Sequence, residues 1–239
     1  MGIFDRSGPR YISHMGFTPL APDNSLPGFE YAGIFKQWAV ETDVHMSADN
    51  VLVCNHNATV DAAYDGTGAI KEMTWSELSQ LRLKGGTRRE CFMDAQLRMP
   101  LFAEYLAICK KYGCVPFIEM KTPDAEEVVR AVREAGLHDD QVVISASKLE
   151  WLVSVRKYSK NVFLHWIFAE EDGLDQLRAL GNAGLSWDYP NCRECPIEKI
   201  ELAHSMGLKV CLRAGDNVDD VRYMREIGLD YIPTNCMHE

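Results

Sequence analysis

The 239-residue sequence contains no segment that could cross a membrane or direct secretion. No apolar run approaches the roughly 20 residues that span a bilayer, so no integral membrane association is expected. The N-terminal stretch MGIFDRSGPRYISHMG has no basic start followed by an apolar segment, as a secretory leader would have. It also departs from the myristoylation pattern, because Arg6 stands where Ser or Thr is needed. These absences predict a cytoplasmic protein.

Positive charge is scarce as well. Lys and Arg number 25 against 35 Asp and Glu, which gives a net charge of −10 and a pI near 5.2. Binding along a nucleic-acid backbone requires clustered basic side chains, so no nucleic-acid partner is expected, although a few local cations could still hold a small anion. The eight cysteines are scattered, and no second pair repeats the spacing of Cys192 and Cys195, which favours free thiols over a zinc site.

Strands and helices alternate along most of the chain. Helices are expected over residues 101–112, 124–135, 148–158, 171–180, 196–206 and 217–227, with short apolar strands between them. The expected barrel strands number eight and lie near residues 10, 38, 115, 141, 162, 184, 208 and 230. Eight alternating units in fewer than about 250 residues predict a closed (β/α)8 TIM barrel. A doubly wound open sheet is the alternative, but no G-x-G-x-x-G follows any strand.

The alternation is interrupted once, after the second strand. A return strand over residues 51–54 and an irregular stretch up to Pro100 predict a hairpin-plus-loop insertion at about residues 45–99. It contains a short helix capped at Thr74, with Glu77 three residues further on. We therefore predict one TIM-barrel domain over residues 1–239, with the insertion lying over its site.

Residues 38–56, WAVETDVHMSADNVLVCNH, combine a strand, a tight turn and a return strand ending at His56. Side chains alternate along a strand, so Glu41 and Asp43 project the same way, with His45 next on that face. Carboxylates on an otherwise apolar strand are unfavourable unless a cation neutralises them. Mg2+ and Ca2+ prefer carboxylate oxygens, so this strand predicts a divalent-cation site.

Other ionisable residues stand where barrel strands end. They are His14, the pair Glu119 and Lys121 in FIEMK, and Arg213. Functional residues of TIM barrels gather at the carboxyl ends of the strands. Singly, each residue has a structural explanation, but ionisable groups on four strand ends indicate one shared site.

These motifs resemble the glycerophosphodiester phosphodiesterase family in order and over nearly the whole chain. The family pattern runs H-R-G, P-E-N-T, E-x-D-V, H-D and E-x-K. The corresponding stretches here are His14-Met15-Gly16, Pro22-Asp23-Asn24-Ser25, Glu41-Thr42-Asp43-Val44, His56-Asn57 and Glu119-Met120-Lys121. The D-G-T-G turn at 65–68, W-S-E-L at 75–78 and the closing GLDYIPTN also resemble the family.

The resemblance implies a metal-dependent phosphodiesterase that acts on a small-molecule glycerophosphodiester. It implies Glu41, Asp43 and Glu119 as ligands of Mg2+ or Ca2+, His14 and His56 as the acid–base pair, and Lys121 as a phosphate contact. In the family, a neighbouring glycerol hydroxyl is thought to attack phosphorus and give a cyclic phosphate, which water opens. A cation suits this chemistry because the charge of a phosphodiester repels nucleophiles.

The sequence departs from the family at positions that normally carry positive charge. Met15 replaces the arginine of H-R-G, and Ala62 falls in the stretch that corresponds to L-D-R-T-T. The V-W-T-V-N strand end reads Cys211-Leu212-Arg213-Ala214-Gly215, which brings an arginine into the stretch where the family carries a tryptophan. Arg213 could bind phosphate bidentately or form a surface ion pair. Trp187 is a candidate for lining a headgroup pocket.

Three alternatives remain open from the sequence, as does the oligomeric state. The substrate could be a sugar or lysophospholipid diester, the chain could be a catalytically impaired binding homologue, or it could be a metal-dependent sugar isomerase on the same barrel. Retention of both histidines argues against a binder, since binding needs no acid–base pair. Lys121 favours phosphate over sugar carbonyl chemistry.

Overall fold

The computed structural model describes residues 2–4, 10–212 and 215–237. The strands are β1 Tyr11–Ser13, β2 Ala39–Met46, β3 Leu52–Cys54, β4 Val115–Met120, β5 Val143–Ala146, β6 Phe163–Ile167, β7 Ala183–Ser186, β8 Lys209–Cys211 and β9 Ile232–Thr234. The α-helices are α1 Leu26–Ile34, α2 Trp75–Leu78, α3 Phe102–Tyr112, α4 Ala125–Glu134, α5 Leu149–Tyr158, α6 Leu174–Leu180, α7 Ile197–Ser205 and α8 Val218–Glu226.

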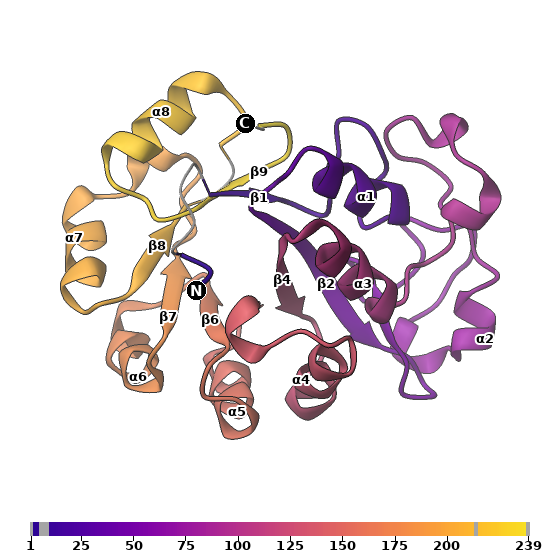
Figure 1. Ribbon diagram of the computed structural model, residues 1–239, viewed down its shortest axis with the longest axis horizontal. Helices are drawn as coiled ribbons and strands as arrows, with labels where there is room; N and C mark the ends of the chain where they lie inside the picture. The colour runs from indigo at the N-terminus through magenta and orange to yellow at the C-terminus, as the bar shows by residue number, and fades with distance from the viewer. Residues whose placement is uncertain (1, 5–9, 213–214, 238–239) are drawn as a thin grey trace.

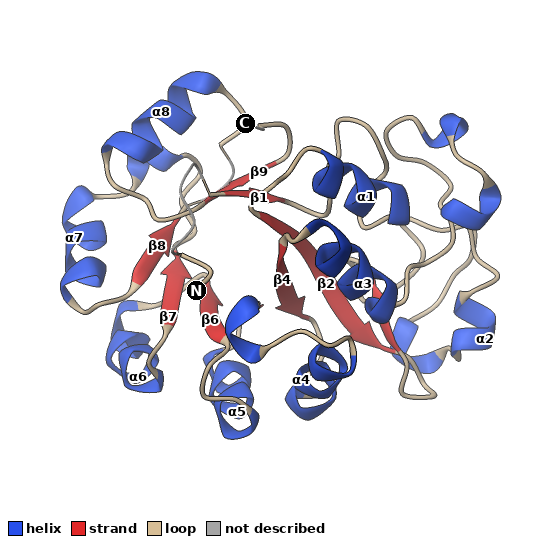
Figure 2. Ribbon diagram, in the orientation of Figure 1, coloured by secondary structure: helices blue, strands red, loops and turns tan. Residues whose placement is uncertain are grey.

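Eight strands form a nearly closed parallel barrel. The strand order is β8-β7-β6-β5-β4-β2-β1-β9, and each neighbouring pair along it is parallel. The two ends approach each other through Asp230 N, which donates to Val210 O at 3.0 Å, and through Gly215 N, which donates to Pro233 O at 2.8 Å. The helices surround this ring of strands (Figures 1 and 2). The predicted TIM barrel is confirmed.

The helices bury their apolar faces against the outside of the barrel. In α4, Val128, Val129 and Val132 are buried, whereas Arg130 lies on the exposed side and pairs with acidic residues one turn away. Helix α3 ends at Gly113, whose φ of 71° is a left-handed conformation that glycine adopts without a Cβ clash. The apolar spacing within each helix and the residues that end it are the reason why the helix bounds predicted from the sequence are close to those of the structure.

The barrel interior has an aromatic base. Phe4 packs against Trp38, Phe163 and Tyr231, with ring centroids 4.8 to 5.8 Å apart. The indole of Trp38 donates to Ile3 O at 3.0 Å, which fastens this N-terminal piece to the start of β2. Side chains fill this base, and the cavity that the described residues enclose lies toward the carboxyl ends of the strands.

The segment between β2 and α3 lies outside the ring (magenta in Figure 1). It starts with β3, antiparallel to β2, and contains α2 and the 3-10 turns Ile70–Glu72, Arg89–Cys91 and Asp94–Gln96. It has a small core of its own, which includes Tyr64, Leu78 and Met99. Thr74 and Glu77 form the expected capping box at the start of α2. In the described part of the chain, no helix is both long and apolar enough to span a membrane.

Candidate active site

Three carboxylates meet where β2 and β4 approach their carboxyl ends. Asp43 and Glu119 are partners in the parallel register of these strands, and Glu41 lies two residues earlier on the same face as Asp43. One carboxylate oxygen from each residue lies within 4.8 Å of the other two. Glu41 and Asp43 are buried. The strand register therefore places three acids in one small volume.

The turn after β1 closes over Glu41. Met15 N donates to Glu41 Oε2 at 2.7 Å, in a turn where Met15 has a φ of 53° and Gly16 a φ of 87°. A Cβ at Gly16 would lie 2.9 Å from the carbonyl carbon of Gly28, so only glycine fits there. The residue that replaces the family arginine thus contributes its backbone amide to the acidic cluster.

Asn24 supports the cluster from the start of α1. Its Nδ2 donates to Asp43 Oδ2 at 2.9 Å, and its Oδ1 accepts from Thr42 Oγ1 at 2.6 Å. Asn24 is buried and has a φ of 47°, a conformation that asparagine tolerates better than most residues. The sequence showed Asn24 only as part of a family motif, and no role was predicted for it.

The charges of the cluster do not balance among the described residues. Lys121 Nζ lies 3.1 Å from Asp43 Oδ1 and also contacts Glu119, so one ammonium faces three carboxylates. Burial, together with the charges of Asp43 and Glu119, holds the pKa of Glu41 well above its usual range. Burial and the Asp43 charge likewise raise the pKa of Glu119. Glu41 Oε1 is buried and has no hydrogen-bond partner in the described residues. This oxygen-rich, under-neutralised group fits a hard divalent cation.

His14 has its ring orientation set by a chain of contacts from the last strand. Asn235 donates from Nδ2 to Asp216 Oδ2 at 2.6 Å and from its backbone N to Asp216 Oδ1 at 2.7 Å. Its Oδ1 must then accept, and it lies 3.0 Å from His14 Nδ1. His14 Nδ1 therefore carries the hydrogen, and Nε2 is the nitrogen that can accept a proton.

His56 enters the same cavity from the loop after β3. Its Nδ1 lies 2.9 Å from Asn57 Oδ1, and its carbonyl oxygen lies 3.3 Å from His45 Nε2. His45 is buried, and burial lowers its pKa. His45 therefore supports the loop that carries His56, whereas the acidic cluster comprises the three carboxylates alone.

One cavity of about 630 Å³ joins these groups at the barrel mouth. Of the predicted site residues, His14, Glu41, His56, Glu119, Lys121 and Trp187 line it. Asp43 does not line the cavity itself but contacts Lys121, which does. Ala62 is exposed on the insertion. Arg213 lies outside the described residues, so its predicted phosphate contact stays a prediction.

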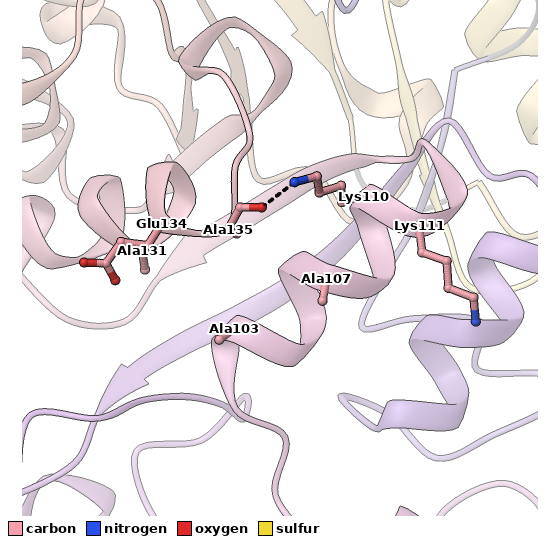
Figure 3. A pocket seen from close by; sticks show the side chains of 7 residues that line it. All are labelled: Ala103, Ala107, Lys110, Lys111, Ala131, Glu134 and Ala135. Carbon is pink, nitrogen blue, oxygen red and sulfur yellow. Dashed lines mark hydrogen bonds between the residues drawn. The ribbon is translucent and has the colours of Figure 1, made fainter.

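A second hollow, between α3 and α4, lies on the outside of the barrel (Figure 3). It is lined largely by alanines, and Lys110 Nζ donates across it to Ala135 O at 2.9 Å. Lys111, at its other side, pairs with Glu30. Its lining, as far as the structure describes the chain, contains no convergent acid–base pair, so the hollow does not resemble a catalytic site.

The fold and this cavity define a (β/α)8-barrel protein with an acidic cluster flanked by two histidines at the carboxyl ends of its strands. The protein belongs to the glycerophosphoryl diester phosphodiesterase family, whose sequence model matches residues 14–239. The resemblance noted in the sequence is confirmed.

Relatives of known name agree with this membership. A glycerophosphodiester phosphodiesterase of Caldanaerobacter subterraneus subsp. tengcongensis is 27% identical over 234 residues, which cover 94% of this chain and 93% of that protein. Human glycerophosphodiester phosphodiesterase 1 is 30% identical over 111 residues, or 46% of this chain. That match spans 33% of the human protein's length.

Solved structures share the fold. A phosphodiesterase from Oleispira antarctica, in complex with the product sn-glycerol-3-phosphate, superposes with a TM-score of 0.82 at 23% identity. The alignment covers 95% of this chain and 93% of that one. At this identity, the likeness establishes the barrel.

Proposed function

We propose that this protein is a phosphoric diester hydrolase that cleaves a glycerophosphodiester to an alcohol and glycerol phosphate. The observation that carries the proposal is that a cluster of three carboxylates, one lysine and two histidines lie in or beside a single cavity, in a chain of this family. A protein that only bound its ligand would have no use for the two imidazoles.

Glu41, Asp43 and Glu119 would hold one divalent cation, Mg2+ or Ca2+. The donor set is entirely oxygen, which favours these ions over Zn2+. When bound, the cation supplies charge stabilisation to the phosphoryl oxygens. Asn24 would keep the Asp43 carboxylate oriented, since groups that hydrogen-bond a ligand also orient it.

The two histidines would divide the proton transfers. His14, with its hydrogen held on Nδ1 by Asn235, takes the proton of the attacking hydroxyl at Nε2. His56, on the loop after β3, donates a proton to the leaving alkoxide. Imidazole suits both tasks because it exchanges protons near neutral pH.

Lys121 would contact the phosphate, and Trp187 would contact the organic part of the substrate. Met15 supplies no charge where the family has an arginine, so Lys121 is the cation on which phosphate binding depends most among the described residues of the cavity. Arg213 would add a second positive charge from the β8 side.

Hydrolysis of a panel of diesters tests the proposed function. We expect glycerol phosphate release from at least one of glycerophosphocholine, glycerophosphoethanolamine, glycerophosphoinositol and a lysophospholipid. Activity should be lost in EDTA and restored by Mg2+ or Ca2+. Cation binding without turnover of any diester would instead identify an impaired binding homologue. Interconversion of sugars without diester cleavage would identify an isomerase.

The acidic cluster also predicts how cation binding depends on pH. The pKa of both Glu41 and Glu119 is raised above the ordinary value of 4.5. Such groups favour the fold below about pH 4.5 and lose that contribution as pH rises through their raised values. The cation-free protein should therefore lose stability from pH 5 to pH 8, and added Mg2+ or Ca2+ should raise Tm more at pH 8.

Thermal melts at pH 5 and pH 8, with and without cation, measure this difference. Glu41→Gln is the comparison variant, because it removes one of the two titrating carboxyls. Most of the difference between the cation-induced rises in Tm at pH 8 and pH 5 should vanish in this variant. An equal cation-induced rise in Tm at both pH values in the unmodified protein would contradict the assignment of the cation to this cluster.

A further inference from the structure

A chain of polar side chains, from Ser186 through His165 to Tyr231, lies inside the barrel next to the catalytic groups. His165 of β6 lies with Nδ1 2.5 Å from Tyr231 Oη and with Nε2 3.2 Å from Ser186 Oγ. His165 and Tyr231 are both buried, whereas Ser186, at the end of β7, is half-buried. His165 and Ser186 line the same cavity as His14 and Glu41. None of these three residues has a place in the proposed proton transfers.

The direction of the hydrogen bonds follows from burial. Burial raises the pKa of Tyr231 well above its usual range, so the phenol keeps its proton and donates it to His165 Nδ1. Burial also lowers the pKa of His165 to about 3, so the imidazole is neutral and its one hydrogen lies on Nε2. Nε2 then donates to Ser186 Oγ. The hydroxyl hydrogen of Ser186 is consequently left for another acceptor.

Among the described residues, the acceptor available to the Ser186 hydroxyl is a poor one. Cys211 Sγ lies 3.8 Å from His165 Nε2, and Ser186 hydrogen-bonds to this thiol. Neutral sulfur is a weak acceptor, so a ligand oxygen at the cavity surface would replace it favourably. Within the described part of the chain, Ser186 is thus a preoriented donor that lacks a strong acceptor.

The local backbone makes room for this chain of side chains. Gly184 is the β7 partner of His165 in the sheet register, and a Cβ there would lie 2.6 Å from Tyr231 Oη. A side chain at this position would push the phenol away from the imidazole. The missing side chain at Gly184 thus leaves space for the Tyr231 hydroxyl. A buried polar network is favourable only when its members have hydrogen-bond partners.

The strand order separates Ser186 and its partners from the acidic cluster. In the strand order, β4, β5 and β6 separate β7 from β2, which places Ser186 on the opposite wall from Glu41. A phosphodiester with its phosphate at the acidic cluster would direct one of its organic groups across the cavity toward Ser186.

The hydrogen-bonding chemistry of Ser186 indicates which kind of substrate group it can bind. A quaternary ammonium cannot accept a hydrogen bond from Ser186, although Asp188 also lines the cavity, and an acyl chain would bury the Ser186 hydroxyl without a strong partner. A hydroxyl accepts from Ser186 and can donate in turn. We propose that Ser186, positioned by His165 and Tyr231, hydrogen-bonds a hydroxyl of a polyol group of the substrate, whether the glycerol part or a sugar-like leaving alcohol. This inference rests on the proposed function.

Two pairs of ligands, measured by calorimetry with Mg2+ present, test it. sn-Glycerol 3-phosphate is compared with propyl phosphate, and inositol phosphate with cyclohexyl phosphate, since each pair differs in its hydroxyls. Ser186→Ala should weaken the hydroxylated member of one pair about 3- to 10-fold, the effect of one lost neutral hydrogen bond, and change its partner less than about 2-fold. The affected pair identifies the glycerol part or the leaving alcohol.

Three further variants separate this role from a structural one. Ser186→Thr keeps a hydroxyl and should retain the selectivity. Tyr231→Phe removes the hydrogen bond that fixes the His165 tautomer, so it should reduce the selectivity without touching the ligand. Ser145→Ala is the matched control, because Ser145 is buried on neighbouring β5 and donates to Ile118 O at 3.2 Å.

If Ser186→Ala changes both members of each pair equally, or neither member of either pair, the inference is overturned. That outcome is distinct from failure of the proposed function, which would appear as absent diester cleavage by the unmodified protein. The binding comparison requires no turnover.

Discussion

Glu41→Gln is expected to lower kcat/KM by about 1,000-fold or more while making the cation-free protein more stable. The value of kcat/KM should fall because the variant removes one of three carboxylate ligands, and a cation provides several kcal/mol of transition-state stabilisation. The stability should rise because a neutral amide ends the repulsion with Asp43 and Glu119 that contributes to the raised pKa of Glu41. A glutamine carbonyl can still accept from Met15 N. Diester hydrolysis and thermal melts at pH 8 measure the two effects.

The opposite signs make this result diagnostic. A residue that served only the fold would lose stability and activity together when replaced. Glu150→Gln is the control, because Glu150 is exposed on α5 and should change neither quantity. Glu41→Gln protein that retained both its activity and its cation-induced rise in Tm would remove Glu41 from the ligand set.

His14→Ala and His56→Ala should each lower kcat by about 100-fold or more and leave cation affinity nearly unchanged. Neither imidazole belongs to the carboxylate group that would hold the cation. Substrate turnover at saturating diester measures the first effect, and cation titration followed by Tm measures the second.

The two histidines should also differ from each other. Asn235 holds the hydrogen of His14 on Nδ1, so Asn235→Leu should lower kcat by allowing the wrong tautomer. His138→Ala is a matched control, because His138 is exposed ahead of β5, at the other end of the barrel. Wild-type kcat in both single histidine variants would refute the acid–base assignment.

The sequence alone determined the barrel and the composition of its mouth. Apolar spacing, capping residues and glycine stops are local features, so the alternation of strands and helices could be read without the structure. The period of two along β2 likewise placed Glu41 and Asp43 on one face. The family resemblance came from short motifs whose residues, such as His14 and Lys121, carry recognisable chemistry.

The tertiary structure alone decided which distant residues meet. Asn235 contacts His14 across 221 positions of sequence, because β9 pairs with β1 and brings the chain end beside its start. Tyr231 reaches His165 across 66 positions, through space that Gly184 leaves open on a third strand. Contacts of this kind depend on register and barrel closure, and no local pattern specifies them. The proton positions on His14 and His165 follow from these contacts, so the fold sets the tautomer of both imidazoles.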